Sequence, residues 1–107
     1  MEDCIAKLAY HGKPVPDSLP ESERPAYQML CELYRMYRAG NMDRQTAAAL
    51  KAALMRYPDC PLPERAALLR FFFLTAFERA RSGQAEAWGL ALALFNEYAR
   101  LPLDKCR

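Results

Sequence analysis

The sequence has few residues that favour β-strands. Its only β-branched residues are Ile5, Val15, Thr46 and Thr75, whereas alanine and leucine recur throughout the chain. Because β-branched side chains favour strands and Ala and Leu favour helices, the composition argues against a β-sheet. We therefore expect an all-α fold with a single domain over residues 1–107. Its architecture should be a small helical bundle of about four helices, arranged as two antiparallel helical hairpins with an N-terminal arm.

The sequence is also poor in the residues that build metal and catalytic sites. It has one histidine, His11, and its four cysteines are far apart, without a CxxC pair. Zinc sites and activated cysteine nucleophiles need Cys or His partners, and phosphate cradles need GxGxxG or GxxxxGK[ST] motifs, which do not occur either. We therefore expect no metal, no cofactor and no catalytic residues, and we expect that the protein is not an enzyme.

Membrane and export signals are missing as well. No apolar run approaches the roughly 20 residues that a membrane-spanning helix needs, and no charged start followed by an apolar signal core occurs. The formal net charge of +2 gives no global field that would favour nucleic acid. We expect a cytoplasmic protein with free thiols, of which Cys31 is buried while Cys60 and Cys106 are exposed.

Prolines and glycines divide the chain into helical segments. Residues 1–21 are expected to form a short helix and a Pro-rich arm, which lies against the body of the protein or against a partner. Residues 22–57 are expected to form the first helical hairpin, because Gly40 can end one helix in the left-handed conformation and Asp43 can cap the next. Ser22 is expected to cap the first helix of this hairpin.

Residues 63–101 are expected to form the second helical hairpin. Pro63 suits the first turn of a helix and Gly83 can end that helix. The first helix of this hairpin is apolar on nearly every side, so it is either the central helix or an interface. A short chain has a limited interior, and self-association would cover the excess apolar surface. The predicted hydrophobic interface residues are Met29, Met36, Phe71, Phe73 and Trp88.

Aromatic and basic side chains gather near the turn of the first hairpin. Aromatic rings mixed with arginine can stack on bases and bind phosphate. The same pattern is typical of an ordinary helix end, where arginine complements the helix dipole and tyrosine borders the core, and we prefer this structural interpretation. The candidate ligand-binding or partner-binding residues are Tyr34, Tyr37, Arg38, Arg44, Lys51 and Arg56.

The stretch from Leu30 to Leu54, LCELYRMYRAGNMDRQTAAALKAAL, resembles the short helical hairpins of the SHOCT type. Together with the preceding LPESERPAYQML, it is similar to uncharacterised small proteins encoded in prophages and mobile elements of Firmicutes. The resemblance implies a genetic context, and with it the cytoplasm of a host cell, but it implies no activity. The sequence departs from the SHOCT pattern in having a full second hairpin, so an oligomerising role is not carried over.

These observations favour a non-enzymatic binding protein. Small phage-borne helical proteins often act by binding, so we expect two partners: a host protein, for example of a defence system, and a second copy of the chain. One alternative is a sponge for a phosphate-bearing signalling nucleotide, enclosed by Tyr34, Tyr37, Arg38 and Arg44 of neighbouring subunits. Another is a small DNA- or RNA-binding regulator, which is disfavoured because residues 46–50 offer few side chains that reach base edges.

Overall fold

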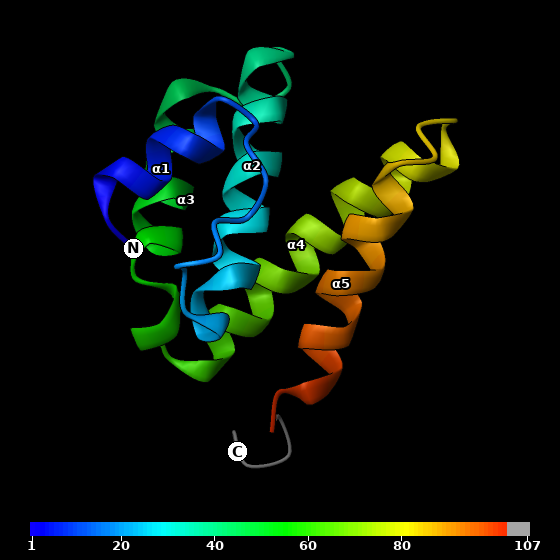
Figure 1. The fold of residues 1–107 in the computed structure, drawn as a ribbon. Coiled ribbons are helices and arrows are strands. Elements are labelled where there is room, and N and C mark those ends of the chain that lie inside the picture. Colours follow the sequence, from blue (N-terminus) through cyan, green and yellow to red (C-terminus); the bar gives the residue numbers. More distant parts are fainter. Residues whose placement is uncertain (103–107) are drawn as a thin grey trace. The chain divides into compact units, whose positions relative to one another are not determined.

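The structure is a computed structural model, and it describes residues 1–102. Within this range the chain forms five α-helices, two short 3-10 helices and no β-strand (Figure 1). The prediction of an all-α fold is confirmed. The α-helices are α1 (Asp3–Tyr10), α2 (Arg24–Arg38), α3 (Arg44–Met55), α4 (Leu62–Arg81) and α5 (Ala87–Arg100).

The chain divides into two compact units. The first unit, Met1–Asp59, contains α1, α2 and α3, and the second unit, which begins at Cys60, contains α4 and α5. The boundary falls between the two hairpins that the sequence predicts, in a segment rich in proline. That the two units form a single domain stays a prediction.

Helix α2 is the central helix of the first unit. Both α1 and α3 contact it (Figure 1). The N-terminal arm therefore lies against its own unit, with Ala6 and Ala9 of α1 buried. The extended chain after α1 is also attached to α2, because the Tyr27 hydroxyl donates a hydrogen bond of 2.7 Å to the carbonyl oxygen of Lys13.

The start of α2 differs from the sequence prediction. Ser22 was expected to cap this helix, but it lies inside a 3-10 helix, Glu21–Glu23, that leads into α2. The residue at the N-cap position is Glu23, and its side chain makes no capping hydrogen bond. The prediction for Ser22 is wrong because the three residues before α2 already form a 3-10 helix, whereas Pro25 does lie in the first turn of α2 as expected.

The connection between α2 and α3 follows the prediction. Gly40 has a φ of +78°, which is the left-handed conformation that ends a helix at low steric cost. Asp43 then caps α3, with its Oδ2 atom accepting a hydrogen bond of 3.1 Å from the backbone N–H of Thr46. This hydrogen bond stabilises the charged carboxylate, and it holds the pKa of Asp43 below its ordinary value.

The lowered pKa of Asp43 predicts a pH-dependent contribution to stability. A carboxylate whose pKa is lower in the folded state stabilises the fold above its unfolded pKa, and this stabilisation is lost as the pH falls through the folded value. We expect the Tm difference between the wild type and Asp43→Ala to shrink between about pH 6 and about pH 3.

The matched control for this experiment is Asp43→Asn. Asparagine caps helices about as well as aspartate but does not titrate, so the Tm difference between Asp43→Asn and Asp43→Ala should stay constant over the same pH range. Thermal melts followed by circular dichroism measure all three proteins. A difference between the wild type and Asp43→Ala that does not change with pH would show that the carboxylate charge adds nothing to this cap.

The second unit is a helical hairpin of α4 and α5. Pro63 lies in the first turn of α4, and Gly83, with a φ of +117°, follows its end. The two helices contact each other and run in opposite directions (Figure 1). Their buried side chains include Leu69, Phe72 and Leu94, each 0% exposed. None of the helices among residues 1–102 is both long and apolar enough to span a membrane.

Candidate binding sites

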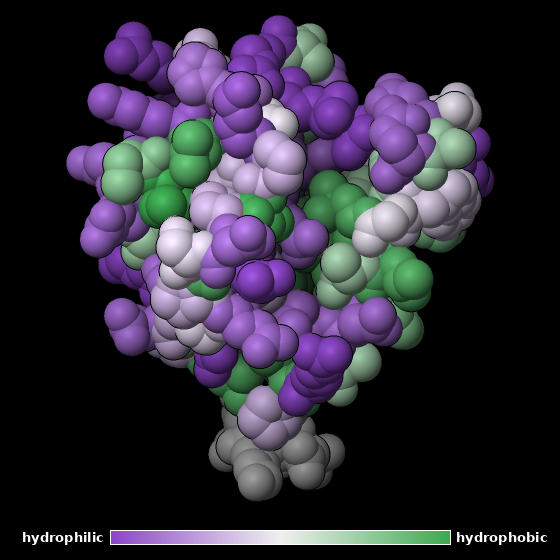
Figure 2. Space-filling view, viewed as in Figure 1, coloured by the Kyte–Doolittle hydropathy of each residue, from purple (hydrophilic) through white to green (hydrophobic). Residues whose placement is uncertain are grey.

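Large apolar side chains lie exposed on the second unit. Figure 2 shows hydrophobic residues reaching the surface over α4 and α5. Leu92 is 61% exposed, which is far above the level of a core leucine. We call this surface the hairpin face, and it consists of Phe71, Leu74, Trp88, Leu92 and Phe95, each at least 40% exposed.

The spacing of these residues places them on one side of each helix. Trp88, Leu92 and Phe95 of α5 follow one another at intervals of four and three residues, which bring side chains onto the same side of a helix. Ring contacts then join α5 to α4. The ring centroids of Phe73 and Phe95 are 5.9 Å apart, and those of Phe77 and Trp88 are 5.4 Å apart.

A hollow lies between the two helices of the hairpin face, where Leu74 of α4 and Phe95 of α5 both line it. Its volume is about 230 Å³, and its lining is almost entirely apolar. For comparison, an apolar cavity of about 150 Å³ can hold a benzene molecule. The hollow can therefore receive one apolar side chain of a partner. Its lining residues are Arg70, Phe73, Leu74, Phe95 and Tyr98.

The structure places the predicted interface residues in different environments. Phe71 and Trp88 belong to the hairpin face, and Phe73 is partly exposed in its hollow. Met36 is partly exposed on α2, in the first unit. The prediction for Met29 is wrong, because this side chain is 0% exposed on a helix that has neighbours on more than one side.

Sequence reasoning missed three members of the hairpin face. Leu74, Leu92 and Phe95 are not among the interface residues that the sequence predicts. The sequence does not separate exposed from buried residues on α5, because this helix is apolar on two sides. Ala91 and Leu94 are buried, whereas Leu92 and Phe95 are exposed. A helix in a two-helix hairpin has a single partner helix within that hairpin, so it buries one side against it.

The turn of the first hairpin brings aromatic and basic side chains together in a second hollow. Its volume is about 270 Å³, and it includes four of the six candidate ligand-binding residues, Tyr34, Tyr37, Arg44 and Lys51. Arg44 and Lys51 are seven residues apart, which is two turns of α3. We call this site the basic hollow; its remaining lining residues are Leu33, Ala47 and Ala48.

Arg38 and Arg56 lie outside the basic hollow. The guanidinium of Arg38 donates a hydrogen bond to the carbonyl oxygen of Tyr10 and lies 5.2 Å from the centroid of the Tyr10 ring. Arg56 donates to the carbonyl oxygen of Ala52, and it follows Arg44 by 12 positions, about 18 Å along a helix. Neither arginine is among the lining residues of the basic hollow, and their assignment to one site with Arg44 stays a prediction.

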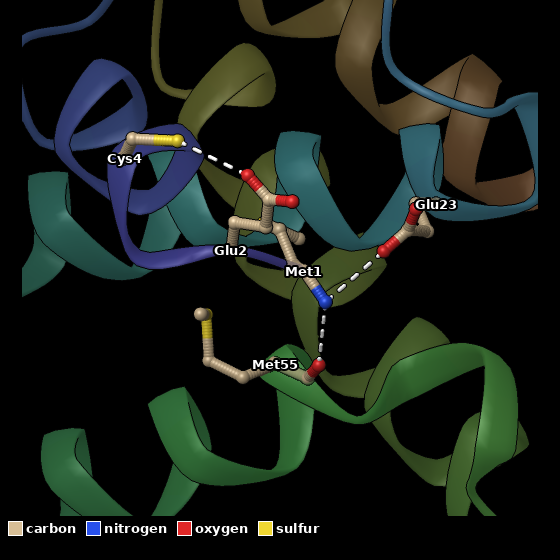
Figure 3. Close-up of polar contacts among 5 residues, drawn as sticks. All are labelled: Met1, Glu2, Cys4, Glu23 and Met55. Carbon is tan, nitrogen blue, oxygen red and sulfur yellow. Dashed lines mark hydrogen bonds and ion pairs between the residues drawn. The ribbon is translucent and has the colours of Figure 1, made fainter.

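A third hollow lies beside the N-terminus. The ammonium group of Met1 donates a hydrogen bond of 3.0 Å to the carbonyl oxygen of Met55 and forms an ion pair of 3.0 Å with Glu23 (Figure 3). Cys4 donates to the carboxylate of Glu2 in the same view. The hollow measures about 500 Å³. Because the Met1 ammonium group and the Glu23 carboxylate already bind each other, we assign this hollow a structural role.

The thiols lie in contrasting environments. Cys31 of α2 is partly buried, and burial raises the pKa of its thiol to about 11. Cys60 is buried, so the expectation of an exposed thiol is wrong; the preceding residues form a 3-10 helix, Tyr57–Asp59, in which Tyr57 is also buried. Cys106 lies outside the described residues. Among residues 1–102, no three His, Cys, Asp or Glu side chains gather as metal ligands would.

We compared the chain with known protein families, curated proteins and solved structures. No known protein family, curated protein or solved structure matches this chain. The functional argument therefore rests on the hairpin face of the second unit and the basic hollow of the first.

Proposed function

We propose that this chain is a non-enzymatic binding protein whose hairpin face docks onto the surface of a protein partner. One observation carries the proposal, namely the exposure of five large apolar side chains on a single hairpin. Their exposed fractions correspond to about 500 Å² of apolar surface, taking roughly 150–250 Å² for a large side chain. Patches of this size on single chains are often functional.

The composition of the hairpin face favours a protein over a membrane as its partner. Aromatic residues and arginine are enriched in protein interfaces. The hairpin face contains one tryptophan and two phenylalanines, and Arg70 lies at its edge. The exposed charges near the face are of both signs, since Glu78 and Arg81 follow on α4 and form an ion pair. A helix surface that binds anionic lipid carries a mainly basic polar face instead.

The resemblance of residues 19–54 to prophage proteins adds a context to this proposal. A protein of a phage or mobile element acts inside a host cell, so a host protein is one candidate partner. We propose that a lysate of the host cell is the place to search for this partner.

The test compares the partners captured by the wild type and by Leu92→Asp. A buried carboxylate without a partner is costly, so Leu92→Asp should reduce captured partner at least about tenfold. The matched control is Ala49→Asp, which adds the same charge at an exposed position of α3. Partners retained by the wild type and by Ala49→Asp, but lost by Leu92→Asp, support the proposal.

Trp88 provides a second readout with purified components. It is the only tryptophan of the chain and is 47% exposed, so its fluorescence should shift to shorter wavelength when a partner covers the hairpin face. If Leu92→Asp keeps every partner of the wild type, and Trp88 emission does not change on binding, the hairpin face is not the docking surface.

A second candidate function is the binding of a phosphate-bearing nucleotide in the basic hollow. The observation that favours it is the convergence of two tyrosine rings and two cationic side chains, because rings can stack on a base while cations bind phosphate. Calorimetric titration with adenosine 5′-monophosphate tests this function. We expect binding that weakens with salt and falls at least about tenfold in Arg44→Ala. Exposed Arg24, mutated to alanine, is the control.

A further inference from the structure

We infer that the partner on the hairpin face is a second copy of this chain, bound so that α4 runs antiparallel to α4 and α5 antiparallel to α5. The inference rests on the proposed function, since it names the occupant of the same face. Its basis is a pattern of charge and size on both helices that becomes complementary to itself under a twofold rotation.

The charges of α4 supply the first half of this pattern. Arg70, Leu74 and Glu78 are all exposed, and they follow one another at intervals of four residues, so they form one row along the helix. Leu74 lies at the centre, about 6 Å along the helix from each charge. A twofold axis through Leu74, perpendicular to α4, places Arg70 opposite Glu78 of the second copy and Glu78 opposite Arg70 of the second copy.

The side-chain sizes of α5 supply the second half. The exposed row on this helix is Trp88, Leu92, Phe95 and Ala99, and its centre lies between Leu92 and Phe95. Reversal about that centre places Leu92 opposite Phe95 of the second copy. It also places Trp88, the largest side chain, opposite Ala99 of the second copy, a small one. Large residues facing small ones are what close packing of two surfaces requires.

A single axis serves both helices. Leu74 and Phe95 line the same hollow, and the ring centroids of Phe73 and Phe95 are 5.9 Å apart. These contacts place Leu74 of α4 at the same level along the hairpin as the centre of the α5 row. One rotation therefore satisfies the charge row and the apolar row together. An unrelated protein partner would require no such internal symmetry of the face.

The area of the hairpin face fits a small symmetric interface. A standard interface buries about 800 Å² per partner, and homodimer interfaces are about 65% apolar. The apolar share is then about 520 Å² per partner, close to the roughly 500 Å² that the five exposed side chains provide. The remaining area falls to the border of the face, where Arg70 and Glu78 lie.

Reversal and exchange of the two charges test the inference. Arg70→Glu places glutamate opposite glutamate twice in each dimer, and Glu78→Arg places arginine opposite arginine twice. We expect each single variant to weaken the dimer at least about tenfold, and the double variant Arg70→Glu/Glu78→Arg to return to within about threefold of the wild type. Sedimentation and light scattering at low salt over a range of concentrations measure the dimer Kd.

Two controls accompany the charge variants. Arg24→Glu makes the same charge change at an exposed position in the first unit and should leave the dimer Kd unchanged. Every variant should keep its helix content, as measured by circular dichroism, because Arg70 and Glu78 are both exposed.

Three outcomes would overturn the inference: a wild type that stays monomeric at every concentration, a dimer that is insensitive to Arg70→Glu, or a double variant that does not recover. These outcomes are separate from failure of the proposed function. If the wild type is monomeric while Leu92→Asp still loses a captured protein, the hairpin face binds a different partner and only the second copy is excluded.

Discussion

Phe72→Ala should lower the free energy of unfolding by about 3–5 kcal/mol. Phe72 is 0% exposed and lies near the middle of α4, so truncation removes the burial of a whole ring and leaves a cavity behind. Domains of this size are stable by about 5–15 kcal/mol, so the variant loses a large part of its stability. Urea denaturation followed by circular dichroism measures the loss as a lower midpoint.

The matched control for Phe72→Ala is Phe95→Ala, the same chemical change on the other helix of the hairpin. Phe95 is 52% exposed, so its truncation should cost about 1 kcal/mol or less when the protein is dilute enough to be monomeric. Equal losses in the two variants would mean that Phe95 is buried in the monomer. The hairpin face would then not be a free surface, and the proposed docking function would lose its main support.

The division of the chain into helices could be predicted because the signals that end and begin helices are local. Gly40 and Gly83 adopt positive φ values, Asp43 caps α3, and Pro63 lies in the first turn of α4, all as the sequence predicts. Each of these signals depends on the backbone within a few residues of it. Ser22 is the exception, because the 3-10 helix before α2 moves the helix start away from it.

The buried side of each helix could not be predicted in the same way. Phe71 and Phe72 are neighbours in the sequence, yet one is 40% exposed and the other 0%. Their chemistry is identical, so only the direction in which each points from α4 separates them, and that direction has meaning only once the neighbouring helices are placed. The prediction for Met29 is wrong for the same reason, because α2 contacts both α1 and α3 and the sequence does not show which side of α2 each of them covers.

The basic hollow could be predicted in part. Arg44 and Lys51 share a side of α3 because they are two helical turns apart, and a short turn places this helix beside Tyr34 and Tyr37 of α2. Arg38 is not among the lining residues of the hollow, and its guanidinium contacts Tyr10 at the end of α1. Contacts within one hairpin follow from helical periodicity, whereas contacts with a separate segment such as α1 do not.

Cys31 is expected to react with iodoacetamide about 100-fold more slowly than a free cysteine at about pH 8. Only the thiolate attacks, and burial raises the pKa of Cys31 from its ordinary value of 9.0 to about 11. The hydrogen bond with Tyr27 and the nearby charge of Arg35 act in the opposite direction, but burial outweighs them. The rate should therefore continue to rise up to about pH 11, where a free thiol has already levelled off.

Mass spectrometry of digested protein, sampled during alkylation, separates the Cys31 peptide from the peptide that contains exposed Cys4. Cys4 should be modified first in the folded protein, and both thiols should react at similar rates in guanidinium, where burial is removed. Rapid modification of Cys31 in the folded protein would mean that α2 opens from its neighbours on the timescale of the reaction. Since α2 contacts both α1 and α3, the same result would show that the first unit, and with it the basic hollow, is not held closed by these contacts.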